Sequence, residues 1–127
     1  MRQATVLVVD DEVEVCRILD RMLRINQYRV ETSHSVAEAL AIIEVRLFDL
    51  YVVDYKLQDG CGLDVAERIR SKGNQAPILL LSGNVLTEVA LKAEELHIFE
   101  IMEKPFSREM IMNALQKATG SLKGVFA

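Results

Sequence analysis

The feature that most constrains the fold of this chain is a fivefold alternation between short apolar runs and longer segments with helical spacing of apolar residues. Short aliphatic runs are typical of strands, and apolar residues three or four positions apart are typical of helices that pack on them. The runs predict strands over residues 4–9, 28–32, 47–53, 77–81 and 98–102. This alternation predicts an α/β fold, doubly wound around a parallel five-stranded sheet.

The polarity of the runs predicts where the strands lie in that sheet. The first, third and fourth runs are almost continuously apolar, as expected for strands that helices cover on both faces. The second run, residues 28–32, alternates between apolar and polar side chains. We therefore expect residues 28–32 to form an edge strand.

Apolar stripes and capping signals predict the first two helices. Cys16 falls on the stripe of the first helix and is expected in the core. That stripe comprises Val15, Ile18, Leu19, Met22 and Leu23. The second helix is predicted to open at Ser35, because Glu38 completes a capping box. Its apolar residues are Leu40, Ile43 and Leu47.

The remaining three helices follow from similar signals. The third is predicted from about Gly62 to a stop near Gly73, which can adopt the left-handed C-cap conformation. The fourth covers about residues 85–96. The fifth should start after Ser107 as its N-cap and end at Gly120. Its predicted buried residues are Ile111, Ala114, Leu115 and Ala118.

Composition limits the class of protein. A chain of 127 residues, 50% hydrophobic, is the size of one domain, with a core expected over residues 4–119. A net charge of −4 without a basic run argues against binding to nucleic acid or anionic lipid. Each apolar run is far shorter than a membrane span, and the start of the chain lacks the pattern of a secretory signal. We therefore expect a cytoplasmic protein, with Cys16 and Cys61 as reduced thiols.

Polar residues terminate or follow the predicted strands. Asp10 and Asp11 follow the first strand, Asp54 the third, and Ser82 the fourth, and Lys104 comes after the fifth. The carboxyl ends of parallel strands lie at one edge of a sheet, where ligands of open α/β sheets bind. We therefore expect three carboxylates, a hydroxyl and an ammonium group to meet there.

This combination of groups suits phosphate chemistry with magnesium. Each residue alone has an ordinary structural role, such as capping a helix or facing solvent. Three carboxylates together repel one another unless they are protonated or bridged by a cation, and Mg²⁺ prefers oxygen ligands. A phosphoryl group would give Ser82 and Lys104 a role as a donor and a counter-charge, with one aspartate as its attacking group. Nucleotide-binding glycine motifs are absent from the sequence, and His34 and His97 are expected on the surface.

These residues resemble the receiver domains of two-component response regulators, over about residues 4–119. The acidic pair Asp10–Asp11, Asp54, Ser82 and Lys104–Pro105 carry the resemblance, since each stands where the family has its functional residue. The resemblance implies a flavodoxin-like (βα)5 fold with strand order 2-1-3-4-5. It also implies that the peptide bond before Pro105 is cis.

The resemblance further implies a mechanism. Asp54 would accept a phosphoryl group from a phosphohistidine on a sensor histidine kinase or phosphotransfer protein. Asp11, Asp54 and the backbone carbonyl of Lys56 would hold Mg²⁺, and Asp10 would orient a metal-bound water. Lys104 would pair with Asp54 and then with the phosphoryl group, while Ser82 would follow that group as a switch. The changed surface would signal to an output domain or partner protein.

The chain departs from the family pattern at several positions. Gln58 stands where proline is usual, which bears on the rigidity of the loop after Asp54, although Gly62 falls where a glycine is expected. His97–Ile98 replaces the usual Gly–Ala, so the end of the fourth helix is expected to differ. Ile101 replaces the aromatic residue that commonly moves in the switch.

Two other functions stay open from the sequence. A magnesium-dependent phosphatase with an aspartate nucleophile would use a pair such as Asp10 and Glu12, two residues apart. A receiver-like protein that binds partners without phosphorylation is the other, and the presence of Asp54 and Lys104 argues against it. We expect a self-phosphorylating signalling switch more than an enzyme with turnover.

Overall fold

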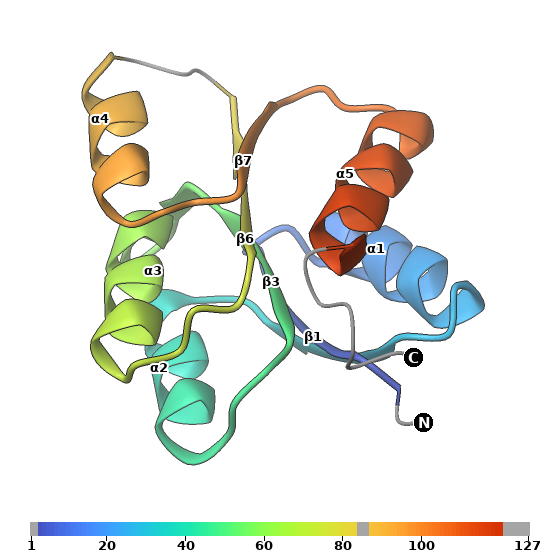
Figure 1. Ribbon diagram of the computed structural model, residues 1–127, viewed down its shortest axis with the longest axis horizontal. Coiled ribbons are helices and arrows are strands. Elements are labelled where there is room, and N and C mark those ends of the chain that lie inside the picture. Colours follow the sequence, from blue (N-terminus) through green and yellow to red (C-terminus); the bar gives the residue numbers. More distant parts are fainter. Residues whose placement is uncertain (1–2, 84–86, 121–127) are drawn as a thin grey trace.

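The computed structural model describes residues 3–83 and 87–120 as a five-stranded parallel sheet between two layers of helices (Figure 1). The sheet order is β2-β1-β3-β6-β7, which is the predicted order 2-1-3-4-5 counted over these strands. A short antiparallel pair, β4 and β5, was not predicted. The strands are β1 (Thr5–Val9), β2 (Arg29–Ser33), β3 (Leu50–Asp54), β4 (Lys56–Leu57), β5 (Gly60–Cys61), β6 (Ile78–Ser82) and β7 (Glu100–Glu103).

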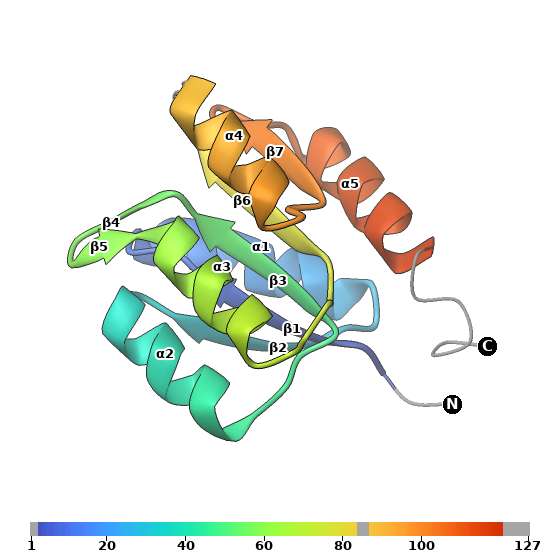
Figure 2. The same cartoon turned by 60° about the vertical axis from the view of Figure 1, so that its left-hand side comes forward.

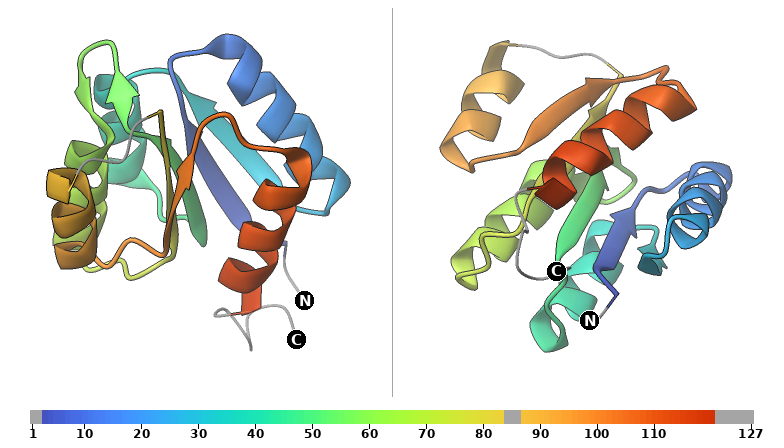
Figure 3. Two further views of the ribbon diagram at one scale, coloured as in Figure 1. Left: turned by 90° about the horizontal axis from the view of Figure 1, so that it is seen from above. Right: turned by 45° about the vertical axis from the view of Figure 1, so that its right-hand side comes forward.

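Within the described residues, five helices cover the two faces of the sheet (Figures 2 and 3). Helices α1 and α5 lie on one face, and α2, α3 and α4 lie on the other (Figure 1). This arrangement confirms the doubly wound prediction. The helices are α1 (Val13–Ile25), α2 (Val36–Val45), α3 (Gly62–Ser71), α4 (Thr87–Glu95) and α5 (Arg108–Gly120).

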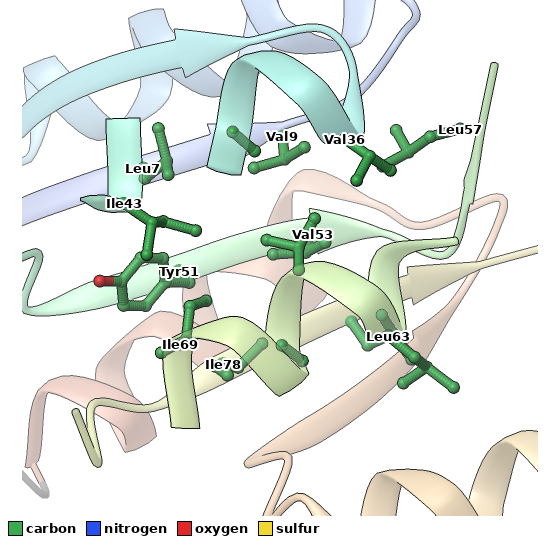
Figure 4. Close-up of a cluster of buried hydrophobic side chains, with 14 of the residues drawn as sticks. Leu7, Val9, Val36, Ile43, Tyr51, Val53, Leu57, Leu63, Ile69 and Ile78 are labelled. Atoms are coloured by element: carbon green, nitrogen blue, oxygen red, sulfur yellow. The ribbon is translucent and has the colours of Figure 1, made fainter. Parts of the chain in front are cut away.

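Alternating side chains of the strands divide the core into two clusters. Leu7 and Val9 of β1 point toward α2 and α3, in the cluster drawn in Figure 4. Val6 and Val8 point toward α1 and α5. Strands β3 and β6 are buried along their whole length, whereas β2 is mostly half-buried, as expected for an edge strand. Burial on both faces explains why β3 and β6 read as continuous apolar runs.

The capping predictions hold with one shift. Ser35 Oγ accepts from Glu38 N at 3.0 Å, and Ser107 Oγ accepts from Met110 N at 3.1 Å. Gly73 has a φ of 81° after α3. The Glu38 carboxylate accepts from the backbone of His34, one residue before the N-cap, so it closes a wider box than predicted. All four residues predicted as the buried face of α5 are buried.

Two apolar assignments were wrong. Ile18 is 58% exposed, because the inner face of α1 is formed by Cys16, Leu19, Met22 and Leu23, and Ile18 lies outside that stripe. Leu47 is 68% exposed, because α2 ends at Val45 and the following turn carries it outward.

The element boundaries also differ from the predictions. The strands begin one to three residues later than predicted. The largest shift is at the start of β3. There Asp49 Oδ2 accepts hydrogen bonds from the backbone N–H and the hydroxyl of Thr5, and these bonds hold the chain out of the strand conformation that was predicted. Helix α4 begins at Thr87, and the predicted start at Val85 lies outside the described residues.

The cysteines and the membrane prediction can be checked as well. Cys16 and Cys61 are both free thiols. Cys16 is buried, and burial raises the pKa of its thiol to about 11, which keeps it protonated at neutral pH. Within residues 3–83 and 87–120, none of the helices has both the length and the apolar character that crossing a bilayer requires.

Arg70 joins the ends of α3 and α4. Its guanidinium group donates to the carbonyls of Asn74, Ala76, Leu96 and His97, at 2.8–3.1 Å. His97 has a φ of 54°, so the chain turns sharply after α4 at the position where the sequence departs from the family pattern.

Candidate functional site

The parallel register of the strands brings the predicted polar residues to one edge of the sheet. Asp10 directly follows β1, Asp54 ends β3, Ser82 ends β6, and Lys104 directly follows β7. The pairing of Val9 with Val53, of Asp54 with Leu81 and of Ser82 with Glu103 aligns these strand ends.

Lys104 is the cation of this site. Its Nζ lies 3.0 Å from Asp54 Oδ1, 3.5 Å from Asp10 Oδ2 and 3.6 Å from Glu12 Oε1. Burial lowers the pKa of Lys104, but the hydrogen bond to Asp54 and the charges of Asp10, Asp54 and Glu12 outweigh burial and raise it overall. Lys104 is therefore a fixed positive charge at neutral pH.

Two of the carboxylates are buried. Asp10 is fully buried and Asp54 is 5% exposed. Burial raises the pKa of Asp54 to about 6. The hydrogen bond from Lys104 opposes that rise, and the charges of Asp10 and Asp11 add to it. Burial also raises the pKa of Asp10, against hydrogen bonds from Glu12 N and Lys104. Asp54 is thus mostly ionised at neutral pH and protonates in mild acid.

The acidic turn after β1 offers oxygen ligands for a cation. Carboxylate oxygens of Asp10, Asp11 and Glu12 lie within 4.8 Å of one another. Such hard oxygen donors fit Mg²⁺, which takes one or two protein carboxylates and keeps several waters. The sequence did not single out Glu12 as part of a receiver site. Its backbone N–H donates to Asp10 Oδ1 at 2.9 Å, and this tight turn brings its side chain back toward Lys104.

The loop after Asp54 is folded closely over it. Gly62 N donates to Tyr55 O at 2.7 Å, which closes the β4–β5 hairpin. A Cβ atom on Gly62 would lie 2.2 Å from the backbone oxygen of Asp54. Only glycine therefore fits this position. Lys56, whose carbonyl was predicted to hold Mg²⁺, lies exposed in β4.

Backbone hydrogen bonds join the other site residues. Lys104 N donates to Ser82 O at 2.8 Å, and Tyr55 N donates to Leu81 O at 2.7 Å. Ser82 is 1% exposed. The bond between Lys104 and Pro105 is cis, as predicted. The strand ends thus form one connected site.

The sequence of the chain matches the model of a known protein family. The model of the response regulator receiver domain matches residues 6–116. The chain belongs to that family. As a receiver domain of two-component systems, it belongs to proteins whose standard chemistry is phosphorylation of an aspartate. The comparison confirms the resemblance inferred from the residues at the strand ends.

Curated relatives contain this receiver domain as one part. The chain is 33% identical to the acid tolerance regulatory protein ActR of Rhizobium meliloti (strain 1021) over 116 residues, which are 91% of this chain and 60% of ActR. It is 30% identical to the transcriptional regulatory protein ZraR of Salmonella typhimurium over 113 residues, covering 89% of this chain and 26% of ZraR. The chain therefore spans less than two thirds of the length of these relatives.

Solved structures share the fold. The non-phosphorylated receiver domain of HemR from Leptospira biflexa matches with a TM-score of 0.86 and 31% identity, covering 91% of this chain and 94% of that chain. The chemotaxis protein CheY4 of Vibrio cholerae matches with a TM-score of 0.85 and 26% identity, covering 92% of this chain and 99% of that chain. The receiver domain thus has a CheY-like fold.

Proposed function

We propose that Asp54 is the phospho-acceptor of this receiver domain and that Lys104 and Ser82 bind the transferred group. The observation that carries the proposal is the 3.0 Å contact between Lys104 Nζ and Asp54 Oδ1, beside the acidic turn after β1. An ionised carboxylate and a fixed cation are what an attack on phosphorus requires at this position.

The donor in this proposal is a phosphohistidine of a sensor histidine kinase or a phosphotransfer protein. An O–P bond forms at an Asp54 oxygen while the P–N bond of the phosphohistidine breaks, and the imidazole leaves with the bonding electrons. Lys104 then moves its hydrogen bond from the carboxylate to a phosphoryl oxygen. The Ser82 hydroxyl donates a hydrogen bond to another phosphoryl oxygen.

Asp10, Asp11, Asp54 and the backbone carbonyl of Lys56 are the proposed holders of Mg²⁺. When bound, Mg²⁺ would neutralise charge on the phosphoryl group. Asp11 and Asp54 would supply carboxylate ligands to the ion, and Asp10 would orient a water next to it. Glu12 is added to this set from the geometry, because its carboxylate shares the acidic turn.

The partners and location follow from the same proposal. Phosphorylation changes the surface around α4, β7 and α5, and an output domain or a partner protein reads that change in the cytoplasm.

The chain is proposed as a single receiver domain over residues 1–127. The proposal is supported by the single sheet, because the two buried apolar clusters on its faces draw side chains from elements between β1 and α5. The net charge of −4 agrees with signalling through proteins rather than direct binding to nucleic acid or membrane.

The geometry argues against Asp10 as the nucleophile of a phosphatase. Asp10 is fully buried, its Oδ1 accepts from Glu12 N, and its Oδ2 faces Lys104. Of the three carboxylates that contact Lys104 Nζ, Asp54 is the nearest.

Intact-mass analysis after incubation with acetyl phosphate and Mg²⁺ tests the proposal. One phosphoryl group should be added to the wild-type chain and none to Asp54→Asn. Asp20→Asn is the control, because Asp20 lies on α1 and pairs with Arg24. Labelling of Asp54→Asn equal to wild type would refute Asp54 as acceptor. Rapid turnover of simple phosphate monoesters would favour a phosphatase, and partner binding without any labelling would favour a phosphorylation-independent module.

A further inference from the structure

The tip of the β4–β5 hairpin is bound to the start of α2 by one carboxylate. Asp59 Oδ1 accepts from Val36 N at 2.8 Å, and Asp59 Oδ2 accepts from Ala37 N at 3.0 Å. The first amides of a helix have no partner inside the helix, and the helix dipole favours a negative charge there. The bonds from Ala37 N and Val36 N lower the pKa of Asp59, so it is ionised at neutral pH.

Apolar contacts support the same junction. Leu57 of β4 is 5% exposed and lies next to Val36 in the buried cluster (Figure 4). A Cβ atom on Gly60 would lie 3.2 Å from Val36 Cγ2, so the backbone of the hairpin passes close to α2. The hairpin is therefore held against the first turn of α2 at its tip and along its apolar side.

The segment that leads into α2 also contacts the acidic turn after β1. Asp10 N donates to Ser33 O at 3.0 Å, and His34 Nδ1 lies 3.1 Å from Asp10 O. Residues 33–37 therefore touch two separate loops, one that carries Asp10 and one that carries Lys56. Both loops contain proposed holders of Mg²⁺.

We propose that Asp59 is a positioning residue for the magnesium site, which fixes the Lys56 carbonyl relative to Asp10 and Asp11 by fastening the hairpin to α2. The inference rests on the proposed function, because it assumes that these groups hold Mg²⁺. Asp59 itself needs no contact with the ion. Its effect runs through residues 33–37, which bridge the two loops.

The test compares Asp59→Ala and Asp59→Asn with wild type. The rate of labelling by acetyl phosphate is measured over a range of Mg²⁺ concentrations, and Mg²⁺ binding is measured separately by amide NMR. In Asp59→Ala the Mg²⁺ concentration for half-maximal rate should rise about tenfold, the lower end of the range for residues that orient metal ligands, while the rate at saturating Mg²⁺ stays near wild type. Hydrogen exchange of the Val36 and Ala37 amides should become faster.

Two controls separate positioning from charge and from folding. Glu67→Ala removes one negative charge from an exposed position on α3 and should leave the Mg²⁺ requirement unchanged. Asp59→Asn loses the charge but keeps one oxygen that can accept from α2, so it should be intermediate between wild type and Asp59→Ala. If Asp59→Asn and Asp59→Ala are equally affected, charge alone explains the result and the proposal is wrong.

The remaining outcomes are also decisive. An unchanged Mg²⁺ requirement in Asp59→Ala would overturn the inference. So would a lower maximal rate at an unchanged Mg²⁺ requirement, since that shows only a smaller folded fraction. If the wild-type chain neither binds Mg²⁺ nor accepts the phosphoryl group, the proposed function itself fails, and the inference falls with it.

Discussion

The ammonium group of Lys104 lies 3.0 Å from Oδ1 of Asp54, and this contact joins the loop after β7 to the end of β3. The Asp54 side chain is 7% exposed and that of Lys104 is 23% exposed, so water screens the pair only in part. A phosphoryl group on Asp54 would enter between these two groups. The contact is therefore the first that phosphorylation must rearrange.

Lys104→Ala should keep the fold and lose most of the response to phosphorylation. The side chain makes polar contacts at the site and adds little to the apolar core. Its loss therefore removes the positive charge beside the phosphoryl group more than it removes packing. Amide shifts induced by beryllofluoride, a phosphoryl mimic, measure the response at Ser82, Gly83 and α4. Lys92→Ala, which removes a surface lysine paired with Glu95, is the control. A full response in Lys104→Ala would contradict this role.

Asp54→Asn should be more stable than wild type at pH 8, by about 3 kcal/mol, with a smaller difference at pH 5. The pKa of Asp54 is about 6 in the folded chain against an ordinary value of 3.8. The folded state therefore binds more protons between these values, and wild-type stability falls as pH rises through about 6. Asparagine does not ionise, so the stability of the variant does not fall in this pH range. Urea denaturation at both pH values measures the difference, and an equal difference at both would refute the raised pKa.

Mg²⁺ should bind weakly, because the proposed site offers few protein ligands and would leave the remaining positions of the ion to water. Titration followed by amide NMR should shift residues 10–12, 54–57 and 82–83. Asp11→Asn should weaken binding, whereas Asp20→Asn should not. Shifts confined to other parts of the chain would reject the site.

Gly62→Ala should destabilise the chain by about 1–3 kcal/mol and disturb the site, because the added methyl group would meet the Asp54 backbone oxygen at 2.2 Å. Gly120→Ala at the end of α5 is the matched control, since a Cβ atom there meets nothing within 4 Å. Thermal unfolding of both variants measures the difference. Equal stabilities would show that the hairpin moves aside without cost.

Ser82→Ala should impair the response to beryllofluoride more than Ile101→Val. Ser82 ends β6 beside Asp54, whereas Ile101 is a partly buried residue against the α2–α3 cluster and has no ring to transmit a rotation. We expect the response to reach Ser82, Gly83 and Thr87, with a smaller change at Ile101. Loss of the response in Ile101→Val, with Ser82→Ala unaffected, would show the reverse coupling.

The sequence was sufficient to predict the sheet and the strand-end residues, because strand burial appears directly as apolar runs. The edge strand β2 and the caps Ser35 and Ser107 followed from local patterns for the same reason. Contacts between distant segments could not be predicted in this way. The bond between Asp59 and α2 joins residues more than twenty positions apart, and no local pattern marks it.

Glu12 and Ile18 show the same limit at single positions. The place of Glu12 beside Lys104 depends on a turn closed by its own backbone N–H, which the bare sequence does not reveal. Ile18 is apolar like its neighbours on α1, and only the packed helix shows that it faces outward.

The bonds of Arg70 bear on how α4 can move. Its guanidinium group donates to the Leu96 and His97 carbonyls just after that helix, and to the Asn74 and Ala76 carbonyls between α3 and β6. The end of α4 is thereby held to the end of α3 and to the segment before β6, while its first residue, Thr87, lies on the side of Ser82. A change at Ser82 would therefore rotate α4 about its end, which the bonds of Arg70 hold in place. Displacement would be greatest at the start of the helix and smallest at its end.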